Sequence, residues 1–141
     1  MFLVDTNVIS EARKGAKADR GVQAFLHATA MEDIYLAVQT VGELCQGLER
    51  IRARGGAPQA GLLERWLALQ LAQYEDRILD FDRECAQVWG RLMAIQPHNP
   101  IDKQIAAIAL IHDLTIVTRN TQDFEGTGVS MVNPFSLENV A

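Results

Sequence analysis

The chain has 141 residues, of which 48% are hydrophobic and 22% charged, as in an ordinary globular protein. This length predicts a single domain over residues 1–141. The longest apolar stretch, residues 105–111, is too short to span a bilayer, and the N-terminus lacks the basic region of a signal peptide. We therefore expect a cytoplasmic protein with no membrane association. The net charge of −5 gives no support for a nucleic-acid partner, but a bound cation would reverse the local potential at an acidic site.

Short apolar runs alternate along the chain with segments of helical periodicity. In chain order, the predicted elements are a strand at 2–4, a helix at 6–11, a loop at 13–19, a helix at 22–30, a strand at 34–38, helices at 40–54 and 62–74, a strand at 78–81, a helix at 83–95, a buried helix opened by Asp102, a strand at 115–118 and a short strand at 129–132. Strands that alternate with helices predict a three-layer α/β/α sandwich with a mainly parallel sheet.

The predicted helix at 40–54 carries apolar residues at helical spacing, which indicates one buried stripe. Its members are Val41, Leu44, Cys45, Leu48 and Ile51. Residues 55–58, Gly-Gly-Ala-Pro, are expected to end this helix. Cys85 lies in a similar apolar pattern, so we interpret both cysteines as buried free thiols of a cytosolic protein.

Four acids, Asp5, Glu43, Asp102 and Asp123, lie where a predicted strand ends or a helix begins. Each has a structural explanation: Asp102 could cap its helix, Asp123 a turn, Asp5 could bind downstream backbone N–H groups, and Glu43 could be a first-turn acid favoured by the helix dipole. In a parallel α/β sheet, however, the carboxyl ends of the strands share one edge. The four side chains are therefore expected to converge there.

Converging carboxylates need protons or a cation, because two of them about 4 Å apart repel by roughly 4 kcal/mol at an effective dielectric near 20. Oxygen-only ligands suit Mg²⁺ or Mn²⁺. Such a cation can activate an attacking water and stabilise charge on a phosphate. The acids therefore predict a metal-dependent phosphodiesterase, most simply a ribonuclease.

Four segments, and a fifth near the C-terminus, resemble the PIN domain, in particular the VapC/FitB-type toxins of bacterial type II toxin–antitoxin pairs. They are LVDTNVISE (residues 3–11), TVGELCQGL (40–48), IDKQIAAIAL (101–110), IVTRNTQDFEG (116–126) and VNPF (132–135). The resemblance covers essentially the whole chain. It implies a PIN-like α/β/α fold and an Mg²⁺- or Mn²⁺-dependent endoribonuclease that cleaves structured RNA such as tRNA or rRNA.

By this resemblance, Asp5, Asp102 and Asp123 would hold the metal, and Glu43 would join them directly or through water. Supporting polar residues are implied on both sides of the site: Thr6, Asn7, Thr118 and Asn120. The resemblance also implies a homodimer and a cognate antitoxin whose tail lies across the active-site groove, in a complex that can assemble further.

Several basic residues are candidates for RNA binding: Arg50, Arg54, Lys103 and Arg119. Glu43, Arg50 and Arg54 fall on one polar helix face, so this face is a candidate path for RNA backbone. The competing explanations are a helix-dipole effect for the arginines and a solvated surface for the others.

Other classes of function remain open from the residues alone. An aspartyl-nucleophile phosphatase would have a second acid two residues after the first, but Asn7 occupies that position. A non-catalytic interaction module with an acidic groove would bind a partner without metal-dependent cleavage. A nuclease of this fold without an antitoxin is a further alternative.

Overall fold

The computed structural model of the chain describes residues 1–136 and has a five-stranded parallel sheet at its centre, with strand order β3-β2-β1-β4-β5. The strands are β1 Phe2–Val4, β2 Ile34–Ala37, β3 Ile78–Leu79, β4 Thr115–Val117 and β5 Met131–Val132. The α-helices are α1 Thr6–Ala12, α2 Arg20–Ala28, α3 Val38–Ala53, α4 Ala57–Gln73, α5 Arg83–Ile95 and α6 Pro100–His112, and the 3₁₀ helices are η1 Gly15–Lys17, η2 Met31–Asp33 and η3 Thr121–Phe124.

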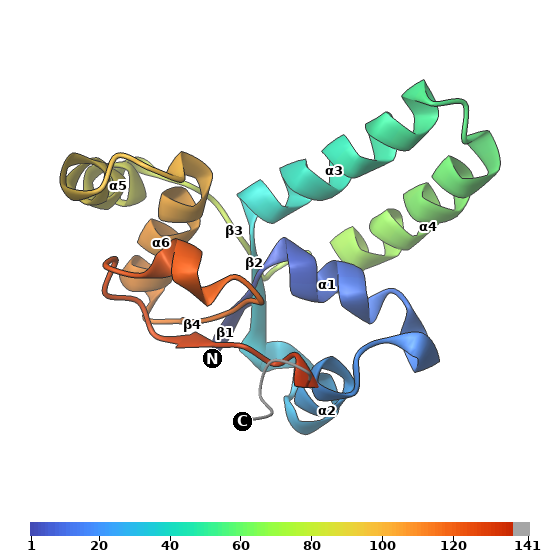
Figure 1. Cartoon of the computed structure of the whole chain (residues 1–141), viewed down its shortest axis with the longest axis horizontal. Helices are drawn as coiled ribbons and strands as arrows, with labels where there is room; N and C mark the ends of the chain where they lie inside the picture. Colours follow the sequence, from blue (N-terminus) through green and yellow to red (C-terminus); the bar gives the residue numbers. More distant parts are fainter. Residues whose placement is uncertain (137–141) are drawn as a thin grey trace.

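Helices cover both faces of the sheet: α1, α2, α3 and α4 lie on one side, and α5 and α6 on the other (Figure 1). Each side has its own apolar cluster, the first including Val8 and Leu48, and the second including Ile105, Ile108 and Phe124. The predicted three-layer α/β/α fold with a parallel sheet is therefore confirmed. The last five residues of the predicted domain 1–141 lie outside the described residues.

Several helix boundaries differ from the predictions, and two of the differences bear on the acids. Helix α3 begins at Val38, two residues early, which puts Glu43 in the second turn rather than the first. Helix α6 begins at Pro100 after Asn99, so Asp102 is inside its first turn and is not the N-cap. Helix α4 begins at Ala57, and Pro58 occupies the first turn, where a missing N–H costs nothing. Gly55 and Gly56 lie between the two helices as predicted, whereas Ala57 and Pro58 already belong to α4.

The prediction of a buried Cys45 is wrong, because this thiol is exposed. Leu44 and Leu48, four residues apart, occupy the buried face of α3, and Cys45 is turned about 100° away from Leu44. Cys85 is buried as predicted. No helix within residues 1–136 combines the length and the apolar character needed to cross a membrane.

Candidate active site

The acidic site lies at the carboxyl edge of the sheet, where β1 and β4 end side by side. Asp5 follows β1 directly, and its backbone N–H donates to the carbonyl of Val117, the last residue of β4, at 2.9 Å. Thr118 follows β4, and Asp123 lies in η3 just beyond it. The strand register therefore places Asp5 and Thr118 next to one another.

Asp5 is buried, with 7% of its surface exposed, and is held by donors from two strand ends. The Thr118 hydroxyl donates to Oδ2 at 2.8 Å, the Asn7 amide donates to the same oxygen at 3.3 Å, and the Thr6 backbone N–H donates to Oδ1 at 2.9 Å. Burial raises the pKa of Asp5 above its ordinary value. The hydrogen bonds from Thr118, Thr6 and Asn7 oppose this shift but do not cancel it. The carboxylate is thus fixed in orientation but only partly compensated.

Asn7 joins the two strand ends through both ends of its amide. Its nitrogen also lies 3.3 Å from the Thr118 hydroxyl, and its oxygen accepts the Arg119 backbone N–H at 3.1 Å. The Asn120 backbone N–H donates to the Thr118 hydroxyl at 3.1 Å. The structure therefore brings the predicted supporting residues Thr118 and Asn7 onto Asp5, whereas Asn120 contributes its backbone.

Glu43 is tied to the site by the residue after Asp5. The Thr6 hydroxyl donates to Oε1 of Glu43 at 2.7 Å. Glu43 is exposed and is the sixth residue of α3, so the first-turn dipole explanation does not apply. Its position on the solvent side of the buried stripe agrees with the predicted face of the helix.

Asp102 lies close enough to the other three acids for their negative charges to raise its pKa. Its pKa is raised to about 6, chiefly by burial and then by the charges of Asp5, Asp123 and Glu43, while Lys103 lowers it. No hydrogen bond to the Asp102 carboxylate occurs within residues 1–136. The capping explanation for Asp102 is therefore wrong, and the electrostatics indicate that the four predicted acids share one region.

Asp123 completes this region from η3. Its backbone N–H donates to the Asn120 carbonyl at 3.0 Å, but its side chain caps neither η3 nor a turn within the described residues. The negative charge of Asp123 raises the pKa of Asp5 as well as that of Asp102. A role in the turn thus explains the backbone hydrogen bond of Asp123, but it does not explain why a carboxylate occupies this position.

The candidate cations lie in different environments. Lys103 is 3% exposed, and its ammonium donates to the His98 carbonyl at 2.5 Å, so the expectation of a surface Lys103 available to RNA is wrong. It follows Asp102 in the first turn of α6, where the helix turns its side chain inward. Arg119, Arg50 and Arg54 are exposed, with Arg119 at the end of β4 and the other two at the far end of α3.

The donor atoms are of the kind that a divalent cation prefers, but within residues 1–136 no group of three or more acidic, histidine or cysteine side chains is arranged so that it could hold a metal ion by itself. The four acids offer only oxygen atoms. Mg²⁺ keeps several waters and is held by one or two carboxylates plus phosphate oxygens, so it needs no closed cage. Asp5 and Asp102 both have raised pKa values that a nearby cation would lower. The chemistry of the donor atoms therefore fits Mg²⁺ or Mn²⁺ held by one or two carboxylates together with water and phosphate oxygens.

A groove of about 530 Å³ lies beside Glu43, and sequence reasoning missed its other residues. It is lined by Gln39, Gly42, Glu43, Gln46 and Ile101. Gln39 and Gln46 lie four residues before and three after Glu43, which is the spacing of one helix face. This spacing could have identified the two glutamines from the sequence. They extend the polar face of α3 that carries Arg50 toward the acids.

Together, fold and site define an α/β protein with an acidic centre at the carboxyl edge of a parallel sheet. Residues 2–128 match the family profile described as PIN domain. The chain is 35% identical over 140 residues to the VapC ribonuclease Y4jK of Sinorhizobium fredii (96% of this chain, 98% of that protein) and 35% identical over 140 residues to toxin FitB of Neisseria gonorrhoeae (96% and 99%).

The solved structure of FitAcB from Neisseria gonorrhoeae superimposes with a TM-score of 0.85 at 33% identity, and the match covers 95% of this chain and 98% of that one. The chain belongs to the PIN-domain family. The resemblance to VapC/FitB-type toxins, first indicated by five sequence segments, is thereby confirmed.

Proposed function

We propose that this chain is a metal-dependent endoribonuclease and the toxin of a type II toxin–antitoxin pair. The observation that carries the proposal is the placement of the acids at the carboxyl edge of the sheet. Thr118 fixes Asp5 there, Thr6 joins Glu43 to the residue after β1, and the charges of Asp5, Asp123 and Glu43 act on Asp102. Such a cluster is costly unless it serves a cation or a proton-transfer step. The similarity to the VapC ribonuclease and to toxin FitB supports the choice of RNA and of a toxin role.

The residues divide the work of phosphodiester hydrolysis in this proposal. Asp5, Asp102 and Asp123 would hold Mg²⁺ or Mn²⁺, which when bound supplies charge stabilisation on the phosphate and a more acidic water. Thr118 and Asn7 keep the Asp5 carboxylate in one orientation. Glu43 keeps Oε1 on the Thr6 hydroxyl, so Oε2 is the atom that would take a proton from the attacking water.

The phosphatase alternative is less compatible with these contacts. In that class, the acid two residues after the nucleophile would serve as the general acid, and here that residue is Asn7. Its amide nitrogen donates to Asp5 and its oxygen accepts from Arg119, so both ends are engaged in positioning. An amide has no titratable proton for the leaving group, so hydrolysis by the metal-site acids is favoured.

The proposal includes partners that the toxin class implies. A cognate antitoxin would bind over the acidic groove, two copies of this chain would form a homodimer, and the complex would assemble further. A cytoplasmic location follows from RNA as the substrate. The non-catalytic interaction module predicts the antitoxin complex but no cleavage, so activity separates these two functions.

The test is cleavage of total RNA by the purified chain with Mg²⁺ or Mn²⁺, with EDTA and the Asp5→Asn variant beside it. We expect discrete, metal-dependent fragments from the wild type and none from Asp5→Asn. Asp80→Asn is the matched control, because Asp80 is an exposed acid after β3 and should keep full activity.

One outcome would invalidate the preparation, and another would contradict the proposal. Fragments that persist in both EDTA and Asp5→Asn would indicate a contaminating nuclease. An intact antitoxin complex whose freed toxin cleaves no RNA with either metal would favour the interaction module.

A further inference from the structure

We infer that Arg119 binds a backbone phosphate of the RNA at the rim of the acidic site, and that the C-terminal segment, residues 133–136, holds its guanidinium in place. The inference rests on the proposed function, since it assigns a substrate contact to the same site. It follows from three sets of contacts: those of Asp19 with the C-terminal segment, those of Phe135 with Arg119, and those of Arg119 with Asn7.

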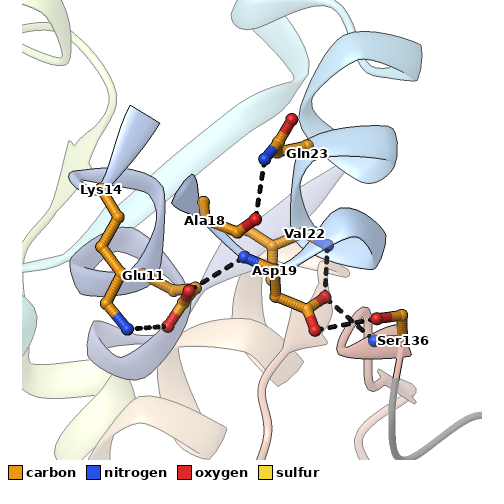
Figure 2. A network of polar contacts seen from close by, with 7 residues as sticks. All are labelled: Glu11, Lys14, Ala18, Asp19, Val22, Gln23 and Ser136. Carbon is orange, nitrogen blue, oxygen red and sulfur yellow. Dashed lines mark hydrogen bonds and ion pairs between the residues drawn. The ribbon is translucent and has the colours of Figure 1, made fainter. Parts of the chain in front are cut away.

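Asp19, the N-cap of α2, binds the C-terminal segment with both carboxylate oxygens (Figure 2). Oδ1 accepts the backbone N–H of Ser136 at 2.9 Å, and Oδ2 accepts its hydroxyl at 2.9 Å. Oδ1 also accepts the N–H groups of Gly21 and Val22 at 2.8 and 3.1 Å. We call the Asp19–Ser136 contacts the C-terminal clamp. One carboxylate thus caps a helix and fixes a segment 117 residues away in the chain.

The C-terminal segment approaches α2 so closely that only glycine fits at position 21. A Cβ there would lie 1.9 Å from the Pro134 carbonyl oxygen and 2.7 Å from the Ser136 nitrogen. The N–H of Asp19 itself donates to Glu11 Oε2 at 2.9 Å, so the clamp is also tied to α1 (Figure 2). The position of the segment is therefore set from two helices.

The clamp places Phe135 beneath Arg119. Phe135 is 5% exposed and belongs to the apolar cluster on the α1–α4 side, and its N–H donates to the Asn133 side chain at 2.9 Å. The Arg119 guanidinium carbon lies 4.8 Å from the centre of the Phe135 ring. Such stacking engages the face of a guanidinium, whereas phosphate is bound by its N–H edge. Stacking and phosphate binding are therefore compatible at one side chain.

Arg119 is also anchored to the acidic site through its backbone. Its N–H donates to Asn7, whose amide nitrogen donates to Asp5, and Thr118, the preceding residue, donates to Asp5 directly. An RNA phosphate that reaches four carboxylates needs positive charge at the rim, and Lys103 is buried against a carbonyl. Arg119 is exposed at this position and supplies that charge.

The test measures binding of bulk tRNA in EDTA, so that cleavage plays no part, over a range of salt concentrations. Loss of one phosphate contact lowers the slope of log Kobs against log salt by about 0.7–0.9. We expect this change for Arg119→Ala, with partial rescue by Arg119→Lys. Phe135→Leu keeps an apolar side chain and removes the aromatic face, so it should weaken binding roughly three- to tenfold, as expected for loss of a cation–π contact.

The clamp is tested by Asp19→Asn and the milder Ser136→Ala, each measured well below its own Tm. Both should weaken tRNA binding in the wild-type background and have no further effect in Arg119→Ala. Asp82→Asn is the matched control, because Asp82 caps α5 through the Cys85 N–H and does not contact the C-terminal segment. It should leave binding unchanged.

An unchanged salt slope in Arg119→Ala would overturn the phosphate contact. Additive losses of Phe135→Leu or Ser136→Ala with Arg119→Ala would overturn the positioning role. Absence of nuclease activity would instead count against the proposed function, because the binding assay is independent of cleavage.

Discussion

Asp5 and Asp102 lie at the same edge of the sheet but are held in different ways. Asp5 accepts hydrogen bonds from Thr6, Asn7 and Thr118, which come from two adjacent strand ends. Asp102 lies in the first turn of α6 and has no hydrogen-bonded donor within residues 1–136, and its pKa is raised to about 6. The protein thus orients one carboxylate by its own donors and leaves the other to a cation or a proton.

This difference separates two contributions to a metal site. Donors on Asp5 reduce the reorganisation needed when a cation binds, as outer hydrogen bonds do in other metal sites. Burial of the Asp102 carboxylate, together with repulsion from the neighbouring acids, makes the cation-free protein less stable than it would be with a neutral side chain. A cation should therefore stabilise the folded chain mainly through Asp102, and catalytic geometry should depend mainly on the surroundings of Asp5.

The largest expected effect is on cleavage by Asp102→Asn and Asp5→Asn. Loss of hydrogen bonds around a metal ligand typically costs 10–100-fold, so loss of a ligand itself should lower the cleavage rate by about 100-fold or more. The two variants should differ in stability: Asp102→Asn should raise the Tm of the metal-free protein, whereas Asp5→Asn should lower it, because an amide cannot accept all the hydrogen bonds of the carboxylate.

Cleavage assays and metal titrations of Tm measure both parts of this prediction. Metal should raise the Tm of the wild type and leave that of Asp102→Asn unchanged. Equal Tm shifts with metal in wild type and Asp102→Asn would show that Asp102 is not a ligand.

A smaller effect is expected from the donors on Asp5. Thr118→Val keeps the shape of a fully buried side chain and removes the 2.8 Å hydrogen bond to Asp5, so the cleavage rate should fall about 10–100-fold. Thr6→Val removes a hydrogen bond to the exposed Glu43 and should cost less than about tenfold. The ratio of the two cleavage rates compares the contribution of the buried donor on Asp5 with that of the donor on the exposed Glu43. A larger loss in Thr6→Val would show that the position of Glu43 matters more than that of Asp5.

Much of this site could be predicted from the sequence because it follows from strand ends. The runs 2–4 and 115–118 end at Asp5 and Thr118, and parallel pairing of β1 with β4 brings these ends together. A hydrogen bond from a downstream backbone N–H to Asp5 was also expected, and the one from Thr6 coexists with the place of Asp5 in the acidic centre. A structural explanation and a functional one were therefore not alternatives at this residue.

The environment of Lys103 and the clamp at Asp19 could not be predicted in this way. Whether a first-turn lysine points outward depends on how α6 is rotated about its axis when it packs. The apolar residues 105–111 lie on all sides of the helix, so they do not indicate this rotation. The Asp19–Ser136 contacts join residues 117 positions apart, and no periodicity encodes such a pair. Gly21 was the available local signal, since a glycine near a helix start often marks a close approach of another backbone.

The pH dependence of stability is expected to reflect Asp102. Its pKa is about 6 in the folded chain and ordinarily 3.8, so between these values the folded state holds a proton that the unfolded state has lost. Stability of the metal-free protein should thus fall as the pH rises from about 4 to about 6, and stay low above that. At 1.36 kcal/mol per pKa unit the upper bound is about 3 kcal/mol, which solvent at this half-buried side chain reduces to roughly 1 kcal/mol.

Thermal melts of wild type and Asp102→Asn from pH 4 to 8 measure the contribution of Asp102 as a difference, so titrating groups that do not interact with Asp102 cancel. We expect the advantage of Asp102→Asn over the wild type to grow by about 3 °C over this range. An advantage that shrinks with rising pH would mean that the carboxylate is stabilised rather than destabilised by its surroundings.

The smallest expected effect concerns the arginines at the far end of α3. Arg52 is paired with Glu49 and Glu64 across the α3–α4 hairpin, whereas Arg50 and Arg54 form no ion pair within residues 1–136. If RNA backbone follows this face from the acids, Arg50→Ala with Arg54→Ala should lower the salt slope of tRNA binding by up to about 1.5, with little change in cleavage at low salt. Arg52→Ala is the matched control, because its charge is already compensated and the slope should hardly change. Equal slopes in all three proteins would limit the RNA contact to the carboxyl edge of the sheet, where Asp5 and Asp102 lie.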